Sequence, residues 1–140
     1  MRRYLTEDGQ GNGVFHLTKA VSLTARDVRN LQLAKAAVVG GIRVLLEQRG
    51  VTADDIASVE LAGGFGNYLS PENVVRIGML PRACLSKIRP LGNTALAGAS
   101  MLALDGENWR KLAEIPEKCR YLELSGRDDF SRAFTDSLTF

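Results

Sequence analysis

The chain is poor in the residues that bind metals. Its 140 residues include two cysteines and one histidine. Cys84 and Cys119 lie far apart, neither belongs to a Cys-x-x-Cys pair, and His16 completes no recognisable metal-binding set. Two thiolates alone cannot hold an iron–sulfur cluster. We therefore expect no metal centre in this chain, and two isolated thiols are typical of a reducing cytoplasm.

An excess of one charge and a long apolar run are lacking as well. The formal net charge is +2, and acidic and basic residues are mixed, so no basic surface for nucleic acid is expected. The longest apolar run, residues 91–104, is interrupted at 92–94 and is too short to span a bilayer. The N-terminus has no apolar signal segment. With 45% hydrophobic residues, the chain is expected to be one cytoplasmic domain over 1–140, or part of a larger protein.

The most distinctive stretch is a strand that runs into glycines. A buried strand expected over residues 56–62 meets Gly63, Gly64 and Gly66, and Ser70 then caps a short helix. Glycine accepts positive φ and lets a ligand approach the backbone. The spacing matches neither the dinucleotide nor the P-loop motif. From the glycines alone, a ligand site and a purely structural turn are equally good interpretations.

A long helix precedes this strand. Thr24 and Asp27 predict its start, and Gly50 predicts its end, which makes it about 25 residues long. Lys35 fills a gap in the apolar stripe of the helix, and Gln32 lies one turn earlier. Either the lysine stem packs while its ammonium reaches solvent, or Gln32 and Lys35 face a polar ligand in a cleft. The pattern alone favours the first. The stripe consists of Val28, Leu31, Val38, Ile42 and Leu45.

The N-terminal residues predict a β-hairpin. Strands are expected over 3–6 and 14–17, around a glycine-rich turn at 7–13. The glycines of this turn resemble a phosphate cradle only superficially. No helix begins directly after them, so no helix N-terminus would face an anion.

The second half of the chain predicts further strands and helices. Strands are expected over 87–91 and 120–124, and a helical stretch over 108–115. Asn93 caps a helix of small apolar residues, which we expect to be buried. Ser125 is expected to cap a C-terminal helix whose aromatic stripe packs in the core. The alternation of helices and strands after a hairpin predicts an α/β fold with a mixed, mostly parallel sheet.

Three segments in this order carry a family resemblance: residues 23–37, 61–69 and 91–99. Together they resemble the C-terminal part of ATP-dependent reductive activators of corrinoid proteins, including the activators of methylamine methyltransferase systems. Those activators belong to the superfamily of actin, sugar kinases and heat-shock chaperone ATPases. The resemblance covers nearly the whole chain and implies an actin-like (ribonuclease H-like) half-domain.

The resemblance also implies a nucleotide site. In that superfamily a Gly-Gly turn after a strand binds adenosine, and a polar residue and a lysine three apart on the preceding helix reach the ribose and adenine. No catalytic residue is implied. The corresponding residues here are Gln32, Lys35, Gly63, Gly64, Phe65, Gly66, Asn67 and Asn93.

The implied activity belongs to a longer protein. Family members use ATP hydrolysis to drive electrons, through an iron–sulfur cluster in another domain, onto corrinoid cobalt, which changes from Co(II) to Co(I). This sequence lacks an Asp-x-Gly-Thr phosphate loop, an acidic residue beside one for Mg²⁺, and a cysteine motif. We expect a C-terminal subdomain that holds ATP or ADP with Mg²⁺ only in part and hydrolyses ATP poorly or not at all by itself. Its expected partners are a corrinoid protein and the remaining domains of the parent chain.

Two alternatives remain open. The chain could be a docking or assembly module that binds a corrinoid protein without a nucleotide, in which case the glycine turn is only structural. It could also belong to another activator of the same superfamily, such as an acyl-CoA dehydratase activator. The oligomeric state, including a homodimer, is open too.

Overall fold

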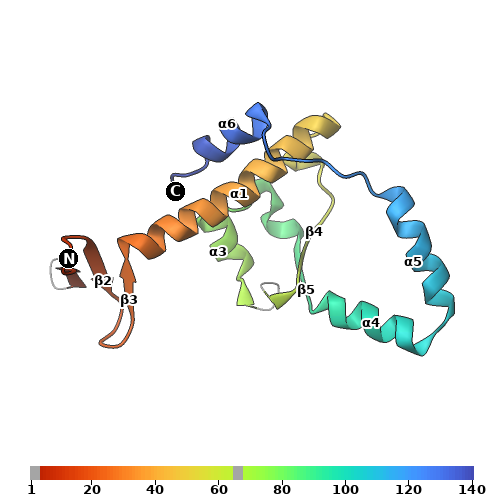
Figure 1. Ribbon diagram of the computed structural model, residues 1–140, viewed down its shortest axis with the longest axis horizontal. Coiled ribbons are helices and arrows are strands. Elements are labelled where there is room, and N and C mark those ends of the chain that lie inside the picture. Colours follow the sequence, from red (N-terminus) through yellow and green to blue (C-terminus); the bar gives the residue numbers. More distant parts are fainter. Residues whose placement is uncertain (1–3, 65–67) are drawn as a thin grey trace.

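The computed structural model describes residues 4–64 and 68–140, which form two small sheets flanked by helices (Figure 1). Strands β1 (Leu5–Glu7), β2 (Gly13–His16) and β3 (Ser22–Thr24) precede the long helix α1 (Ala25–Arg49). Strand β4 (Val59–Ala62), helix α3 (Pro71–Arg76) and strand β5 (Ile88–Gly92) follow, with 3-10 turns at Ala53–Asp55 and Arg82–Lys87. The remaining helices are α4 (Thr94–Leu104), α5 (Glu107–Lys118) and α6 (Asp128–Asp136).

The N-terminal sheet is antiparallel, in the order β1-β2-β3. Leu5 pairs with Phe15, and Phe15 pairs on its other side with Leu23. The predicted hairpin is confirmed. The third strand was not predicted, because three residues carry too little periodicity to stand out in a sequence. Thr18 forms the turn before it, where its hydroxyl accepts hydrogen bonds from the backbone N–H of residues 20 and 21.

Helix α1 begins and ends where its capping residues predict. The Asp27 N–H donates to the Thr24 hydroxyl at 3.1 Å, and the Thr24 N–H donates to the Asp27 carboxylate at 2.9 Å, which completes a capping box. At the other end Gly50 has φ +65°, and its N–H donates to the Glu47 carbonyl at 3.0 Å. This is the left-handed glycine cap that ends many helices.

The buried face of α1 is not the predicted apolar stripe. Val28, Leu31, Val38 and Leu45 of that stripe are exposed in this chain. The buried positions are instead Lys35, Ala36, Gly40, Gly41 and Val44. Small residues line this face because α6 lies close against it: a side chain on Gly40 would meet the Phe130 ring and the backbone of α6.

Strands β4 and β5 form a parallel pair. Val59 pairs with Ile88 and Leu61 with Pro90, so both strands end at the same edge. Ser70 caps α3, accepting from the Asn73 N–H at 3.4 Å, and Pro71 is its first residue. Both strands and the helix between them match the prediction. In Figure 1 their carboxyl ends point away from α1, and α3 returns from that edge toward α1.

The expectation of a single mixed sheet is wrong within the part of the chain that the structure describes. The hairpin belongs to a separate sheet, and α1 carries it away from β4 and β5 (Figure 1). Residues 120–124, predicted as a strand, pair with no described strand. A strand forms only where a neighbour accepts its backbone hydrogen bonds, and periodicity cannot show whether that neighbour is present.

The C-terminal helix begins later than predicted. Ser125 does not cap it; Arg127 is the N-cap residue. The Arg127 guanidinium holds the Asp129 carboxylate with two hydrogen bonds, of 2.9 and 2.6 Å, at the first turn of α6. The aromatic stripe packs on α1 as expected, with the Phe130 and Phe134 rings half-buried and their centroids 6.1 Å apart.

Helix α4 is not buried, contrary to the prediction. Leu104 is 87% exposed and Leu96 64%. In the described structure α4 packs mainly on α5, where the Asn108 amide donates to the Met101 carbonyl at 2.8 Å. The apolar composition of α4 matches the prediction, but the described residues supply little to cover it.

The described core is small and lies beside α1. Its buried hydrophobic residues come from α1, α3 and the segment that follows α3. None of the helices within residues 4–64 and 68–140 combines the length and hydrophobicity needed to cross a bilayer. The buried hydrophobic residues are Ala36, Val44, Val74, Leu80 and Cys84.

Candidate functional site

The glycine turn at the end of β4 has an open backbone. Gly63 has φ +82°, a conformation that residues with a Cβ rarely adopt. Its N–H donates to the Gly92 carbonyl at 2.8 Å, which joins the ends of β4 and β5. An added Cβ at Gly63 or Gly64 would meet no described atom within 4 Å. Among the described residues, nothing therefore blocks the approach of a flat ligand to the main chain here.

Asn93 lies beside this turn. It follows Gly92, whose φ is +68°, and caps α4 by accepting a hydrogen bond from the Leu96 N–H at 3.0 Å. The link between Gly63 and Gly92 places Asn93 and the glycine turn at the same edge of the parallel pair. Polar ligands of parallel sheets commonly bind at this edge, beyond the carboxyl ends of the strands. Three of the predicted site residues, Gly63, Gly64 and Asn93, are thus brought together.

Lys35 has different neighbours. Its side chain is buried, only 3% exposed. The ammonium donates to the Thr139 carbonyl and lies 5.0 Å from the centroid of the Phe140 ring. The interpretation that the ammonium snorkels out to solvent is wrong, because the end of the chain covers it.

Gln32 faces the same C-terminal residues. It is half-buried and lines a cavity of about 340 Å³ together with Arg29, Leu33, Leu138 and Thr139. Gln32 and Lys35 thus lie beside residues 138–140, whereas Gly63, Gly64 and Asn93 lie at the ends of β4 and β5. The predicted site is therefore found in two parts, one at the strand ends and one on α1 beneath the C-terminal segment. Phe65, Gly66 and Asn67 lie outside the described residues.

A further cavity lies where no site was predicted. It measures about 800 Å³ between the first hairpin turn and the start of α1. Its lining residues are Asp8, Gly9, Gln10, Asn12, Thr24, Ala25, Arg26 and Arg29.

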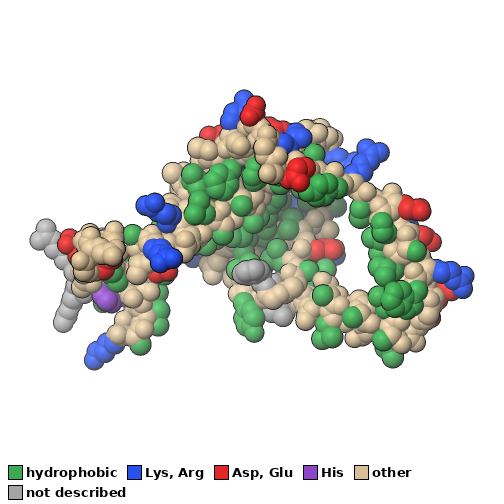
Figure 2. All heavy atoms as spheres, viewed as in Figure 1, with side chains coloured by type: hydrophobic (Ala, Val, Ile, Leu, Met, Phe, Trp, Pro, Cys, Tyr) green, Lys and Arg blue, Asp and Glu red, His purple; other side chains and the backbone are tan. Residues whose placement is uncertain are grey.

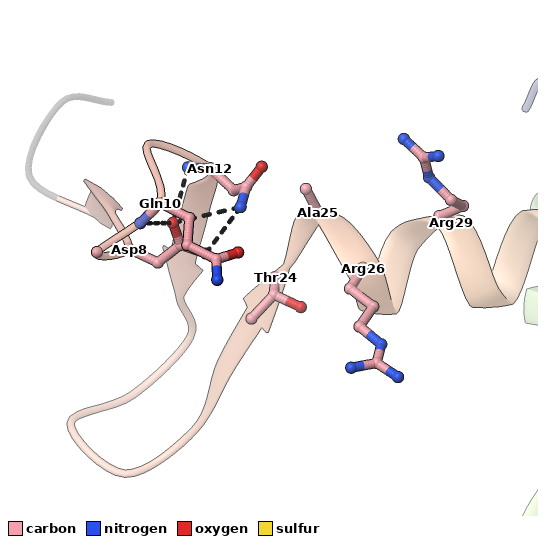
Figure 3. A pocket seen from close by; sticks show the side chains of 8 residues that line it. Asp8, Gln10, Asn12, Thr24, Ala25, Arg26 and Arg29 are labelled. Carbon is pink, nitrogen blue, oxygen red and sulfur yellow. Dashed lines mark hydrogen bonds between the residues drawn. The ribbon is translucent and has the colours of Figure 1, made fainter.

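The hairpin turn and α1 meet because β3 folds the chain back between them. The sequence predicts no helix beside this turn, because β3 is too short to be apparent from it. Figure 3 shows that the guanidinium groups of Arg26 and Arg29 point in opposite directions, so they do not converge on one ligand. Hydrogen bonds from the Asn12 backbone and side chain, and from the Gln10 backbone, lower the pKa of Asp8 and shape the turn.

The residues do not fit a resident metal or cluster. Within the two described ranges no three histidine, cysteine, aspartate or glutamate side chains gather into a metal site. Cys84 is buried and Cys119 exposed, and the whole sequence has no further cysteine. An iron–sulfur cluster held by four cysteines therefore cannot form from this chain alone.

Comparison with known proteins places the chain in a family. Residues 3–140 match the family described as "C-terminal domain of RACo the ASKHA domain". The "Corrinoid activation enzyme RamQ" of Eubacterium limosum is 34% identical over 122 residues, 87% of this chain and 21% of that protein. The "[Co(II) methylated amine-specific corrinoid protein] reductase" of Methanosarcina barkeri is 26% identical over 131 residues, 92% of this chain and 24% of that protein.

A solved structure agrees with the sequence relatives. The "Reductive activator for corrinoid,iron-sulfur protein" superposes with a TM-score of 0.89 at 32% sequence identity, covering 99% of this chain and 23% of that chain. The chain thus spans between a fifth and a quarter of the length of the proteins it matches. Its sequence and its fold lead to the same assignment: the chain belongs to the family of C-terminal ASKHA domains of RACo-type reductive activators of corrinoid proteins.

Proposed function

We propose that this chain holds the adenosine part of ATP within a longer reductive activator, which returns corrinoid cobalt from Co(II) to Co(I). The observation that carries the proposal is the open glycine turn. Gly63 has a positive φ, neither Gly63 nor Gly64 has a described atom where a Cβ would point, and Asn93 lies alongside. The names of the relatives supply the target class, a corrinoid protein of a methylamine system.

The residues divide the work between binding and positioning. The turn backbone at Gly63 and Gly64 lies against the base and ribose, and Asn93 orients the start of α4 beside them. Gln32 and Lys35 complete the polar contacts once the Thr139 carbonyl releases the lysine ammonium. ATP bound here would supply the bond between its β- and γ-phosphates, whose hydrolysis to ADP and phosphate would drive the electron transfer. The charges that act on that phosphate come from other parts of the activator.

The test is calorimetric titration of ADP and adenosine into the intact gene product that carries this segment. Gly64→Val places a side chain on the open face of the turn, and Gly9→Val is its matched control. Neither glycine has a positive φ, and an added Cβ at either would meet no described atom within 4 Å, so neither change strains the described backbone. We expect Gly64→Val to weaken ADP binding at least tenfold and Gly9→Val to leave it within twofold.

A second variant tests the helix side of the site. Lys35→Ala should weaken adenosine binding if the ammonium reaches the ligand. If Gly64→Val binds ADP as well as the unaltered protein does, the turn is structural and the nucleotide role assigned to it is refuted. Retention of a corrinoid protein without any nucleotide binding would then favour the docking function.

A further inference from the structure

The charged end of Lys35 is enclosed by residues far from it in sequence. Lys35 is only 3% exposed, and lysine is almost never fully buried unless it is paired. Its ammonium donates to the Thr139 carbonyl and lies 5.0 Å from the centroid of the Phe140 ring. A Cβ on Gly78, which follows α3, would lie 4.0 Å from the ammonium nitrogen. The ammonium therefore lies near the end of α3 and beneath residues 138–140, which we call the cover segment.

The cover segment also lies over Gln32. Two of its residues form one side of a cavity of about 340 Å³, and three residues of α1, including Gln32, form the other. Cavities that hold small molecules measure about 300–1,000 Å³. Figure 2 shows hydrophobic side chains gathered where the C-terminal end lies over α1. The two residues of α1 that are predicted to contact a nucleotide are thus covered by the same short segment.

Few bonds hold the cover segment in place. A backbone hydrogen bond of 3.2 Å from the Leu138 N–H to the Thr135 carbonyl ties its start to the end of α6. Thr139 and Phe140 belong to no helix or strand, and Phe140 is 62% exposed. Their contacts with the Lys35 ammonium are one hydrogen bond and one cation–π interaction. Segments with an exposed backbone and few buried contacts open locally at low cost, so this segment can leave α1 while α6 stays docked.

We propose that the cover segment is autoinhibitory: it occupies the place where the base or ribose of a nucleotide meets Gln32 and Lys35, so the nucleotide binds there only after the segment has moved away. This inference rests on the proposed function, because it assigns a regulation to the same site. The Thr139 carbonyl and the nucleotide compete for one ammonium group. A ligand that binds only the open state has its apparent affinity lowered in proportion to the fraction of molecules that are open. Weakening the cover segment should therefore strengthen nucleotide binding.

A series of substitutions at Phe140 in the intact gene product tests this competition. Tryptophan gives the strongest cation–π contact, leucine keeps apolar bulk without that contact, and alanine removes both. Without nucleotide, acylation of Lys35, followed by peptide mass spectrometry, should be slowest in Phe140→Trp, faster in Phe140→Leu and fastest in Phe140→Ala. Calorimetric titration should give the same order of ADP affinity, with Phe140→Ala binding ADP about two- to fivefold more tightly than the unaltered protein and Phe140→Trp binding it more weakly. The control is Tyr121→Ala, which removes an 85% exposed ring outside the cover segment and should change neither measurement.

The other outcomes overturn the proposal. If ADP affinity is equal across the series while Gly64→Val still weakens it, the cover segment does not compete with the nucleotide, and the proposed function stands without this regulation. If Phe140→Ala binds ADP more weakly, residues 138–140 support the nucleotide site instead of closing it. Equal acylation of Lys35 in all variants means that the ring does not hold the segment closed. If neither the unaltered protein nor any variant binds ADP, the proposed function itself fails, and the cover segment has no nucleotide to exclude.

Discussion

Two adjacent glycines of α1 provide a test of how α6 is held. Gly40 and Gly41 are both buried inside the helix. A Cβ on Gly40 would lie 3.1 Å from the Phe130 ring and 3.2 Å from the backbone nitrogen of Phe134. A Cβ on Gly41 would lie 3.5 Å from the nearest carbon of Leu124. The first position is too tight for a methyl group, whereas the second is ordinary van der Waals contact.

Comparing Gly40→Ala with Gly41→Ala separates the effect of packing against α6 from the effect of helix propensity. Replacing an interior helix glycine by alanine adds about 1 kcal/mol of stability, and this gain is common to both positions. At Gly40 the methyl group also presses on the backbone of α6, which cannot rotate away as a side chain could. Overpacking of this kind costs about 1–3 kcal/mol. We expect Gly41→Ala to stabilise α1 without disturbing its packing on α6. In the Gly40→Ala variant, α6 should be about 1–3 kcal/mol less stable than in the Gly41→Ala variant.

Hydrogen exchange followed by mass spectrometry is the assay, because it reports on α6 without requiring global unfolding to be two-state. In the intact gene product, amides of residues 128–136 should exchange about 5- to 150-fold faster in Gly40→Ala than in Gly41→Ala. Equal protection in the two variants would refute the reasoning, since α6 would then adjust without loss. Because α6 leads to Thr139 and Phe140, Gly40→Ala should also expose Lys35 to amine-reactive reagents.

Four further predictions concern the caps and the C-terminal contact. Thr24→Ala removes the capping box and should destabilise the start of α1 by about 1 kcal/mol, seen as faster amide exchange over its first turn. Hydrogen bonds from the Thr24 backbone and hydroxyl lower the pKa of Asp27, so the box stabilises the fold above the ordinary pKa of that carboxyl. Its contribution should therefore be lost as pH falls below about 4, and Asp27→Asn should remove this pH dependence of exchange. Asn93→Ala should fray α4 while Asn93→Asp, which keeps the acceptor, should not; equal exchange in the two would show that the cap is unimportant. Phe140→Ala should speed acylation of Lys35, and an unchanged rate would mean that the ring does not shield the ammonium.

Much of the local structure follows from the sequence. Thr24, Asp27 and Gly50 marked both ends of α1, and Ser70 and Asn93 marked the starts of α3 and α4. The hairpin and the strands on either side of α3 were also predicted. Each of these features depends on contacts between residues a few positions apart, so the necessary information is contained in a short window.

The family resemblance could also be recognised from the sequence. Three separated segments carried it, and the match over residues 3–140 and the superposed activator structure bear it out. At the candidate site, Gly63 and Gly64 were singled out because glycine accepts a positive φ, as Gly63 has, and leaves the backbone open; their role as ligand residues stays a prediction. The other residues of the candidate site, such as Gln32 and Lys35, could be named only from the family resemblance, because the sequence near the glycines does not show which helix faces the turn.

The tertiary structure decided what depends on distant contacts. Lys35 meets Thr139, 104 residues away, and no periodicity along α1 indicates that. The docking of α6 selected the small-residue face of α1 for burial in place of the apolar stripe, because two helices approach closely only where side chains are small. The apolar side chains of α4 and α5 remain exposed because no described element packs against them. Composition predicts that a surface should be buried, but only the arrangement of the whole fold determines whether a partner is present to cover it.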